Sequence, residues 1–336
     1  MTPRGRRLIW FSLTAVALVV TPVIVLWWWV AQPFGSTGEP SHMTVTPDLL
    51  HAHVRKLSVD FAPRSYQNQF HLAQCVAYIR EHFAAAGATV LVQEYTIDGS
   101  QFENVMGTFG PEAGPRVIVG AHYDGCDTTP GADDNASGIA GLLALAGLLG
   151  DSPNKPALRV DLVAYCTEEP PHFGGSDMGS YRHAQWLSDQ KVEVAAMICL
   201  EMIGYFTDEP DSQDYPFAAL KLLYPSTGNF IAVVGNTQQR ELLATVKQAM
   251  AGATDLPVHS AAIPEMVPGV DFSDHRSYWE FQYPAVMITD MAFYRNKAYH
   301  TAEDTHERLD YDRMAKVVLG LHQTVRVLAG VTEPTE

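Results

Sequence analysis

Apolar residues recur along this chain at two different spacings, and each spacing predicts its own kind of element. Apolar positions three and four apart, typical of a helix that buries one face, run through Thr46 to Val59 and Gln67 to Ala86. Short apolar runs typical of strands follow at Thr89 to Ile97 and Phe102 to Phe109, with Gly99-Ser100 at the bend between them. We expect these two strands to form a β-hairpin at one edge of a sheet.

The middle of the chain has the strand–helix–strand order of a parallel sheet. Arg116 to Ala121 and Leu158 to Cys166 are apolar strands, and Ala136 to Leu149 between them has a strong helical pattern. This order predicts a right-handed parallel crossover. The remaining expected elements are strands at Ala195 to Leu200, Phe230 to Val234, Val258 to Ile263 and Ala285 to Thr289, and helices at Ser176 to Leu187, Gln238 to Ala251 and Arg308 to Leu328. The pattern predicts an α/β fold with a mixed, mostly parallel central sheet flanked by helices.

The first residues of the chain have a different pattern. No charged residue occurs from Leu8 to Ala31. Taken as a helix rising about 1.5 Å per residue, this stretch is longer than the roughly 30 Å hydrocarbon core of a bilayer. Tryptophans near both ends and arginines before Leu8 favour one transmembrane helix with a cytoplasmic N-terminus. We expect everything after Ala31 to be periplasmic or extracellular, and secreted if the stretch is instead a signal peptide cleaved after Gly35 to Thr37.

Composition divides the chain and limits its partners. We expect an anchor at residues 1–31, a Pro-, Gly- and Ser-rich linker at 32–43 and one folded domain at 44–336, since 336 residues with 47% hydrophobic content suffice for a large core. The net charge of −16, with 22 basic and 38 acidic residues, makes nucleic acid an unlikely partner. The four cysteines allow either disulfide bonds or free thiols. The sequence leaves the oligomeric state open.

Side chains that bind metals follow the ends of successive predicted strands. In open α/β sheets, ligands bind outside the carboxyl ends of the strands, so we expect these side chains to converge. The candidates are His122 and Asp124 after the first central strand, Asp133 and Asp134 in a glycine-flanked turn, Glu168 and Glu169 after the next strand, Glu201 at the end of a third, and His300 in a polar loop far downstream. Any one of these signals is weak alone, and only their combination predicts a site.

Local geometry gives some of these residues distinct roles. In an extended segment His122 and Asp124 point the same way, so the carboxylate can orient the imidazole. Glu168 and Glu169 point to opposite sides, so one can bind metal while the other faces a bound water as a base. Two histidines and three carboxylates, one of them shared, suit two hard-to-borderline cations a few ångströms apart.

The motifs AHYDG, GADDNASG, TEEP, SDHRSYW and YHTAEDT, taken together, resemble the cocatalytic zinc aminopeptidase family. This family includes bacterial leucyl aminopeptidases, aminopeptidase Y and the catalytic domain of glutamate carboxypeptidase II. The resemblance covers Pro47 to Gly330. It implies a zinc-exopeptidase, phosphorylase/hydrolase-like fold, peptide substrates and two Zn²⁺ per chain, with Co²⁺ or Mn²⁺ as possible substitutes.

The resemblance also implies a role for each metal ligand. Asp133 is expected to bridge the two metals, with His122 and Glu201 completing one site and Glu169 and His300 completing the other. Glu201 stands where the family usually has Asp, which lengthens the arm of the carboxylate by roughly one C–C bond. How Glu201 would bind its metal is therefore an open question.

The remaining expected roles concern the reaction. By resemblance, Glu168 is the general base, Asp124 orients His122, Asp134 braces its loop and Asp274 lies near the site. Tyr299 is either a partner of the developing oxyanion or a packing residue.

A pocket rich in carboxylates suits a free α-amine and so favours an aminopeptidase. Arg295 leaves a carboxypeptidase possible, because it can either grip a substrate carboxylate or brace its loop. Glutaminyl cyclisation with one zinc, and a binding ectodomain without activity, are the rival functions. We expect the loop from Phe206 to Ser226 to lie near the site and to help set specificity.

Overall fold

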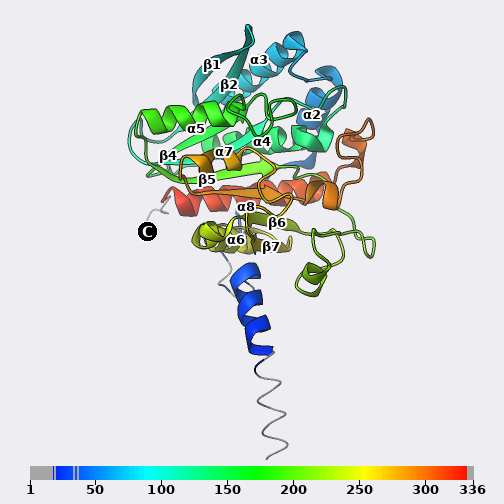
Figure 1. Ribbon diagram of the computed structural model, residues 1–336. Coiled ribbons are helices and arrows are strands. Elements are labelled where there is room, and N and C mark those ends of the chain that lie inside the picture. Colours follow the sequence, from blue (N-terminus) through cyan, green and yellow to red (C-terminus); the bar gives the residue numbers. More distant parts are fainter. Residues whose placement is uncertain (1–17, 19, 33–34, 36–37, 331–336) are drawn as a thin grey trace, which may run out of the picture.

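The computed structural model describes residues 18, 20–32, 35 and 38–330 (Figure 1). Within this part of the chain the strands form one eight-stranded sheet in the order β1-β2-β4-β3-β5-β8-β6-β7. Their bounds are β1 Thr89–Ile97, β2 Ser100–Phe109, β3 Arg116–His122, β4 Arg159–Tyr165, β5 Val194–Glu201, β6 Ile231–Gly235, β7 Val258–Ala262 and β8 Ala285–Thr289. The helices are α2 Pro47–Arg55, α3 Gln69–Ala85, α4 Gly138–Asp151, α5 Gly179–Asp189, α6 Arg240–Ala253, α7 His275–Glu280 and α8 Tyr311–Leu328.

The pairing of the strands confirms the predicted sheet. β1 and β2 form an antiparallel hairpin at one edge, as predicted, and β2 continues antiparallel to β4. The central strands β4, β3, β5 and β8 run parallel, β6 is antiparallel to β8, and β7 is parallel to β6. The carboxyl ends of β3, β4 and β5 therefore meet at one edge of the sheet.

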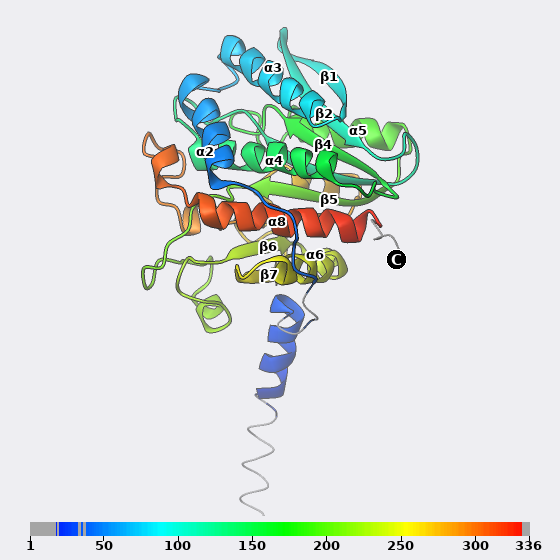
Figure 2. The ribbon, with the colours of Figure 1, turned by 180° about the vertical axis from the view of Figure 1, so that it is seen from behind.

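Helices cover both faces of this sheet because its central strands are apolar on both sides. Along β3, Val117 and Val119 belong to the buried cluster that contains α4 and α8, whereas Ile118 faces the cluster that contains α5 and α7. Figure 2 looks onto the face with α4 and α8, and Figure 1 onto the face with α5 and α7. Near-continuous apolar runs, rather than alternation, are what strands buried on both faces require.

The N-terminal segment meets the domain beside β7. Residues 20–31 are helical, and the helix extends away from the domain (Figure 1). Its end is attached by Ser260 Oγ, which donates to Ala31 O at 3.0 Å, and by Lys247 Nζ, which donates to Gln32 O at 2.7 Å. Among the residues described, no helix has the length and apolar character needed to cross a bilayer. The expected span from Leu8 to Ala31 lies partly outside the described residues, which omit 8–17 and 19.

Two features differ from the elements expected from sequence. The six-residue helix α7 was not predicted, since it is too short to show a helical period. The first expected helix is an α-helix only to Arg55 and continues as a wider π-helical turn at Lys56–Asp60. All four cysteines are free thiols, which answers the question that composition left open.

Candidate metal centre

The candidate ligands lie at the edge of the sheet where the strand ends meet. His122 is the last residue of β3, Glu168 and Glu169 follow β4, and Glu201 is the last residue of β5. Because β3 lies between β4 and β5, the side chains from the three strand ends come together. All four residues are buried, and His122 has no exposed surface.

One carboxylate lies between the two imidazoles. Asp134 Oδ1 is 3.4 Å from His122 Nε2, and Asp134 Oδ2 is 3.0 Å from His300 Nε2. The same two ring nitrogens also face one glutamate each, since Glu201 Oε2 is 3.4 Å from His122 Nε2 and Glu169 Oε2 is 3.2 Å from His300 Nε2. Two ligands of one zinc ion, each about 2.0–2.2 Å from it, lie roughly 3–3.5 Å apart. The separations fit two adjacent sites that share Asp134.

This arrangement corrects the predicted roles of Asp133 and Asp134. Both Asp133 oxygens are occupied, since Oδ1 accepts from Gly204 N at 3.1 Å and Oδ2 accepts from Asn296 Nδ2 at 2.8 Å. Contrary to the expectation for Asp133, the carboxylate that lies between the two histidines is therefore that of Asp134, whereas Asp133 is hydrogen-bonded to neighbouring segments. Neighbouring residues in this turn point to opposite sides, and the sequence alone does not determine which carboxylate faces the site.

Asp124 lies beside His122, as predicted, and it has a second function. The His122 ring nitrogen Nδ1 is 3.2 Å from the Asp124 carbonyl oxygen and 3.5 Å from Asp124 Oδ1. The two carboxylate oxygens of Asp124 also accept from the backbone N–H groups of Glu168 and Glu169, at 3.2 and 3.1 Å. One carboxylate thus fixes the imidazole and the backbone that carries two further site residues.

The Asp304 carboxylate likewise holds the backbone of the Asp133-Asp134 turn, and the sequence did not indicate this role for Asp304. Its Oδ1 accepts from Asp133 N at 3.0 Å and its Oδ2 from Asp134 N at 3.1 Å. The YHTAEDT motif contains this residue, but a contact across such a sequence separation has no local signature. Asp304 holds the shared carboxylate in position through the backbone.

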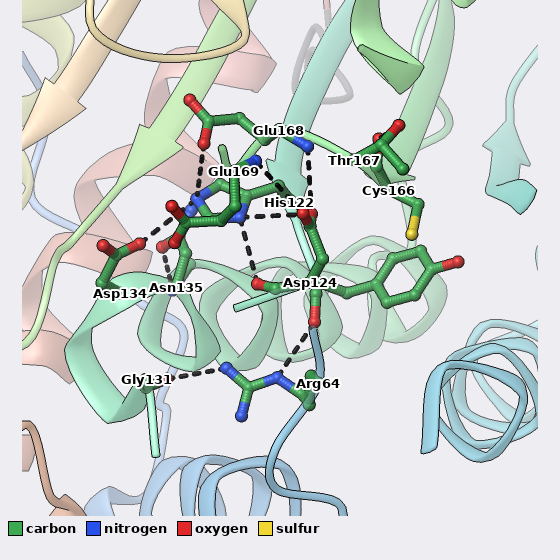
Figure 3. Close-up of polar contacts among 12 residues, drawn as sticks. Arg64, His122, Asp124, Gly131, Asp134, Asn135, Cys166, Thr167, Glu168 and Glu169 are labelled. Carbon is green, nitrogen blue, oxygen red and sulfur yellow. Dashed lines mark hydrogen bonds and ion pairs between the residues drawn. The ribbon is translucent and has the colours of Figure 1, made fainter. Parts of the chain in front are cut away.

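Arg64 is a second residue that the sequence did not reveal. Its buried guanidinium group donates to the carbonyl oxygens of Leu57 (2.8 Å), Tyr123 (2.9 Å), Pro130 (2.8 Å) and Gly131 (2.8 Å). It therefore joins both ends of the loop between β3 and the Asp133-Asp134 turn (Figure 3). At Gly131, where φ is 59°, a Cβ atom would lie 2.3 Å from Asp134 O, so the turn requires glycine.

A hydrogen bond from Ser273, which is not one of the candidate ligands, accommodates the longer side chain of Glu201. Ser273 Oγ donates to Glu201 Oε2 at 2.6 Å, and the same oxygen faces His122 Nε2. Ser273 precedes Asp274, which is buried at the start of α7. Burial raises the pKa of Asp274 to about 7, although the nearby His122 acts in the opposite direction.

The contacts of Arg295 and Tyr299 bear on the roles that the sequence left open for these two residues. Arg295 is buried, where Nε donates to Gln213 Oε1 at 2.7 Å and the guanidinium lies over the Phe230 ring. This supports the loop-bracing interpretation of Arg295. The Tyr299 ring stacks on His300 with centroids 3.8 Å apart.

The electrostatics of the cluster favour bound cations. Burial and neighbouring carboxylates raise the pKa of Glu168 well above its usual value, and burial raises that of Glu169 to about 7. Burial alone would lower the pKa of His300, but Asp134 and Glu169 raise it to about 10. Among the described residues, Glu169 Oε1 and His122 Nε2 have no hydrogen-bond partner. Imidazole and carboxylate donors in this arrangement fit zinc.

An apolar pocket opens beside the cluster. Glu201 and Tyr299 line it on the side of the site, and most of its other lining residues are apolar or aromatic. Tyr215 and Tyr224, from the loop expected near the site, form part of its wall. The pocket can hold an apolar side chain next to the candidate metal centre.

A mixed α/β sheet with such a cluster at its strand ends is the arrangement expected of a metal-dependent enzyme of the zinc-exopeptidase class. Residues 104–325 match the sequence profile of peptidase family M28, and the chain belongs to this family. The resemblance drawn from the motifs is thereby confirmed, as is the identification of a zinc metallopeptidase.

The chain is also similar to individual curated proteins. Over 93% of this chain and 96% of the relative, the sequence is 44% identical to YfbL of Escherichia coli (strain K12), which is described as uncharacterized. It is 30% identical to a probable leucine aminopeptidase of Trichophyton verrucosum, over 65% of this chain and 55% of that protein. The chain therefore spans about half the length of this fungal relative.

Solved structures match the fold. The LapA aminopeptidase of Legionella pneumophila superposes with a TM-score of 0.67 at 18% identity, covering 86% of this chain and 73% of that one. A glutaminyl cyclase of Bacteroides thetaiotaomicron superposes with a TM-score of 0.64 at 19% identity, covering 84% and 98%. At such low identity these matches establish the shared fold and nothing about substrates.

Proposed function

We propose that this chain is a two-zinc aminopeptidase that releases single residues from the N-termini of peptides. His122, Asp134 and Glu201 would hold one ion, and Asp134, Glu169 and His300 the other. The observation that carries the proposal is the position of Asp134, whose two oxygens face the Nε2 atoms of both histidines at 3.4 and 3.0 Å. A carboxylate shared in this way is typical of two-metal hydrolytic sites.

Glu168 is the proposed general base. When bound, the two zinc ions would supply a water of lowered pKa and polarise the scissile carbonyl. The Glu168 carboxylate, 3.9 Å from His122 Nε2, takes the proton of the attacking water and delivers it to the leaving amine. The backbone hydrogen bond from Glu168 to Asp124 keeps this carboxylate in position. Tyr299 beside His300 is the proposed donor to the developing oxyanion.

The surroundings of the cluster support release from the N-terminus. The concentration of carboxylates attracts a free α-amino group. Arg295, the cation that would otherwise recognise a substrate carboxylate, is buried and hydrogen-bonded to Gln213 and Tyr205. The apolar pocket beside Glu201 supports a preference for a large apolar first side chain.

Glutaminyl cyclisation is the second candidate, because glutaminyl cyclases share the fold. Residues for two metal sites lie together here, and this favours the peptidase. Zinc content distinguishes the two functions, since two ions per chain are expected for the peptidase and one for the cyclase.

We also propose that residues 8–31 anchor the chain in a membrane, with a cytoplasmic N-terminus and a periplasmic or extracellular domain. Support comes from the uncharged sequence and from the helix over residues 20–31, where the apolar Ile24 and Leu26 are more than half exposed. Cleavage and secretion is the alternative. A reporter fused after Glu336 that is active only in the cytoplasm would contradict the proposed topology.

The experiment that tests the activity uses the purified full chain in detergent. Leucyl-anilide should be hydrolysed, N-acetyl-leucyl-anilide should not, and a glutaminyl peptide should give no cyclised product. Matched anilides of phenylalanine and aspartate test the apolar pocket, and we expect phenylalanine to be preferred. Equal rates on the free and acetylated leucyl substrates would refute aminopeptidase specificity.

A further inference from the structure

We propose that Cys126 is a ligand of the metal held by Glu169 and His300, which makes the two-metal centre chemically asymmetric. The inference rests on the proposed two-zinc function and goes beyond it. One ion would have nitrogen and oxygen donors only, whereas its neighbour would also bind a sulfur. The ligand set inferred from motifs contains no sulfur, so this assignment comes from the position of the thiol.

The position of the sulfur carries the proposal. The Sγ atom of Cys126, a carboxylate oxygen of Glu169 and a ring nitrogen of His300 all lie within 4.8 Å of one another. With a zinc–sulfur distance of about 2.3 Å and zinc–nitrogen or zinc–oxygen distances of about 2.0–2.2 Å, sulfur and its fellow ligands lie roughly 3.5 Å apart. Small side-chain rotations around an ion would bring these three atoms to that separation.

Within the described part of the chain, one oxygen of the Glu169 carboxylate lacks a partner, whereas the other, Oε2, faces His300 Nε2. Glu169 is 4% exposed, and its Oε1 has no hydrogen-bond partner among the residues the structure describes. A buried charged oxygen without a partner is costly. A cation placed between Glu169, His300 and Cys126 would satisfy it, which is an indication of a ligand independent of the cysteine.

The backbone at Cys126 is held firmly for a residue in a loop. Its carbonyl oxygen accepts from Thr129 N at 3.0 Å and from Thr129 Oγ1 at 2.7 Å. Arg64 secures the loop on both sides, at Tyr123 O and Pro130 O. The sulfur is therefore presented by a fixed backbone, as a metal ligand must be.

The other cysteines do not share this position. Cys75 and Cys166 are buried and belong to none of the groups of possible metal ligands found among the described residues, and Cys199 Sγ lies 3.0 Å from Ser273 Oγ. Cys126 alone is partly exposed at the site. A thiolate there would favour zinc or a softer ion over manganese in the second position, because soft ligands select such metals.

The test uses the full chain, stripped of metal and reloaded with two equivalents of Co²⁺ or Zn²⁺. The Co²⁺ protein should show an intense sulfur-to-cobalt charge-transfer band in the near ultraviolet, and zinc X-ray absorption should show a sulfur shell at about 2.3 Å. Cys126→Ser should lose both signals and lower the binding affinity of one of the two metals by at least about tenfold. Cys199→Ser, the matched control from a second cysteine near the site, should retain both.

Each result has a separate meaning. Two bound metals with no sulfur signal in the unmodified chain would overturn the role of Cys126 and leave the proposed peptidase intact. Failure to bind two metals at all would instead contradict the proposed function, and the inference with it. Loss of the sulfur signals in Cys199→Ser but not in Cys126→Ser would show that Cys199 supplies the sulfur ligand. This result would also overturn the inference.

Discussion

The exchange of roles between Asp133 and Asp134 gives the sharpest mutational test. Asp134→Asn keeps the shape of the side chain and removes the charge that faces His122 Nε2 and His300 Nε2. Loss of a partner outside the ligand shell typically costs about 10–100-fold in metal affinity. Because Asp134 faces both sites directly, we expect each dissociation constant to rise at least about 100-fold, or about 2.7 kcal/mol per metal.

Asp133→Asn is the matched control one residue away. Asp133 accepts hydrogen bonds from Gly204 N and Asn296 Nδ2. An asparagine keeps one acceptor and turns an NH₂ group towards the other donor, which leaves a buried donor unpaired. We expect a loss of about 1–3 kcal/mol in the free energy of unfolding, with two metals still bound.

The assay measures zinc binding with a competing chelator and stability by urea unfolding, for both variants and the unmodified chain. The expected pattern is selective, with lost affinity in Asp134→Asn and lost stability in Asp133→Asn. Near-normal zinc affinity in Asp134→Asn together with zinc loss in Asp133→Asn would refute the assignment and restore Asp133 as the shared ligand.

Three further predictions follow from the same site. Glu168→Gln should retain both metals and lower kcat by several orders of magnitude, because only the proton carrier is lost, and near-normal turnover would remove Glu168 as the base. Glu201→Ala should lose the metal shared with His122 and most of the catalytic rate. Glu201→Asp, whose side chain is about 1.5 Å shorter, should retain metal-dependent activity. Full zinc content and turnover in the alanine variant would exclude Glu201 as a ligand. Finally, the metal-free chain should melt at lower temperature as the pH rises from about 5 to about 9. The raised pKa values of Glu169 (about 7) and His300 (about 10) mean that the folded state binds more protons than the unfolded state across this range. Protons are therefore taken up on folding, and the stability falls as rising pH makes them scarce. A melting temperature that rises over the same range without metal would contradict these pKa shifts.

Much of the fold was predictable because its elements carry strong local patterns. The strands at Thr89–Ile97 and Ala285–Thr289 have the predicted bounds, since turn residues or polar residues delimit a clear apolar run. The convergence of His122, Glu169 and Glu201 followed from the rule that parallel strands end at the same edge. The helix His275–Glu280 escaped because six residues contain less than two turns.

The site was less predictable where it depends on contacts between distant segments. Arg64 holds the backbone carbonyl groups of Tyr123 and Gly131, and Asp304 holds the backbone N–H of Asp134. The residues next to Arg64 and Asp304 in the sequence do not predict these contacts. The choice between Asp133 and Asp134 depends on the dihedral angles of one turn, which two identical adjacent residues do not reveal. The sequence leaves each of the four cysteines as either a thiol or half of a disulfide bond, and only the structure shows that Cys126 lies near His300.

The central claim is that two metals share the Asp134 carboxylate. A crystal structure of the zinc-loaded chain, with anomalous differences recorded at the zinc edge, tests it directly. We predict two anomalous peaks about 3.5–4 Å apart, one beside His122 and Glu201 and the other beside His300 and Glu169, with Asp134 between them. A single peak, or two peaks bridged by Asp133, would contradict the account.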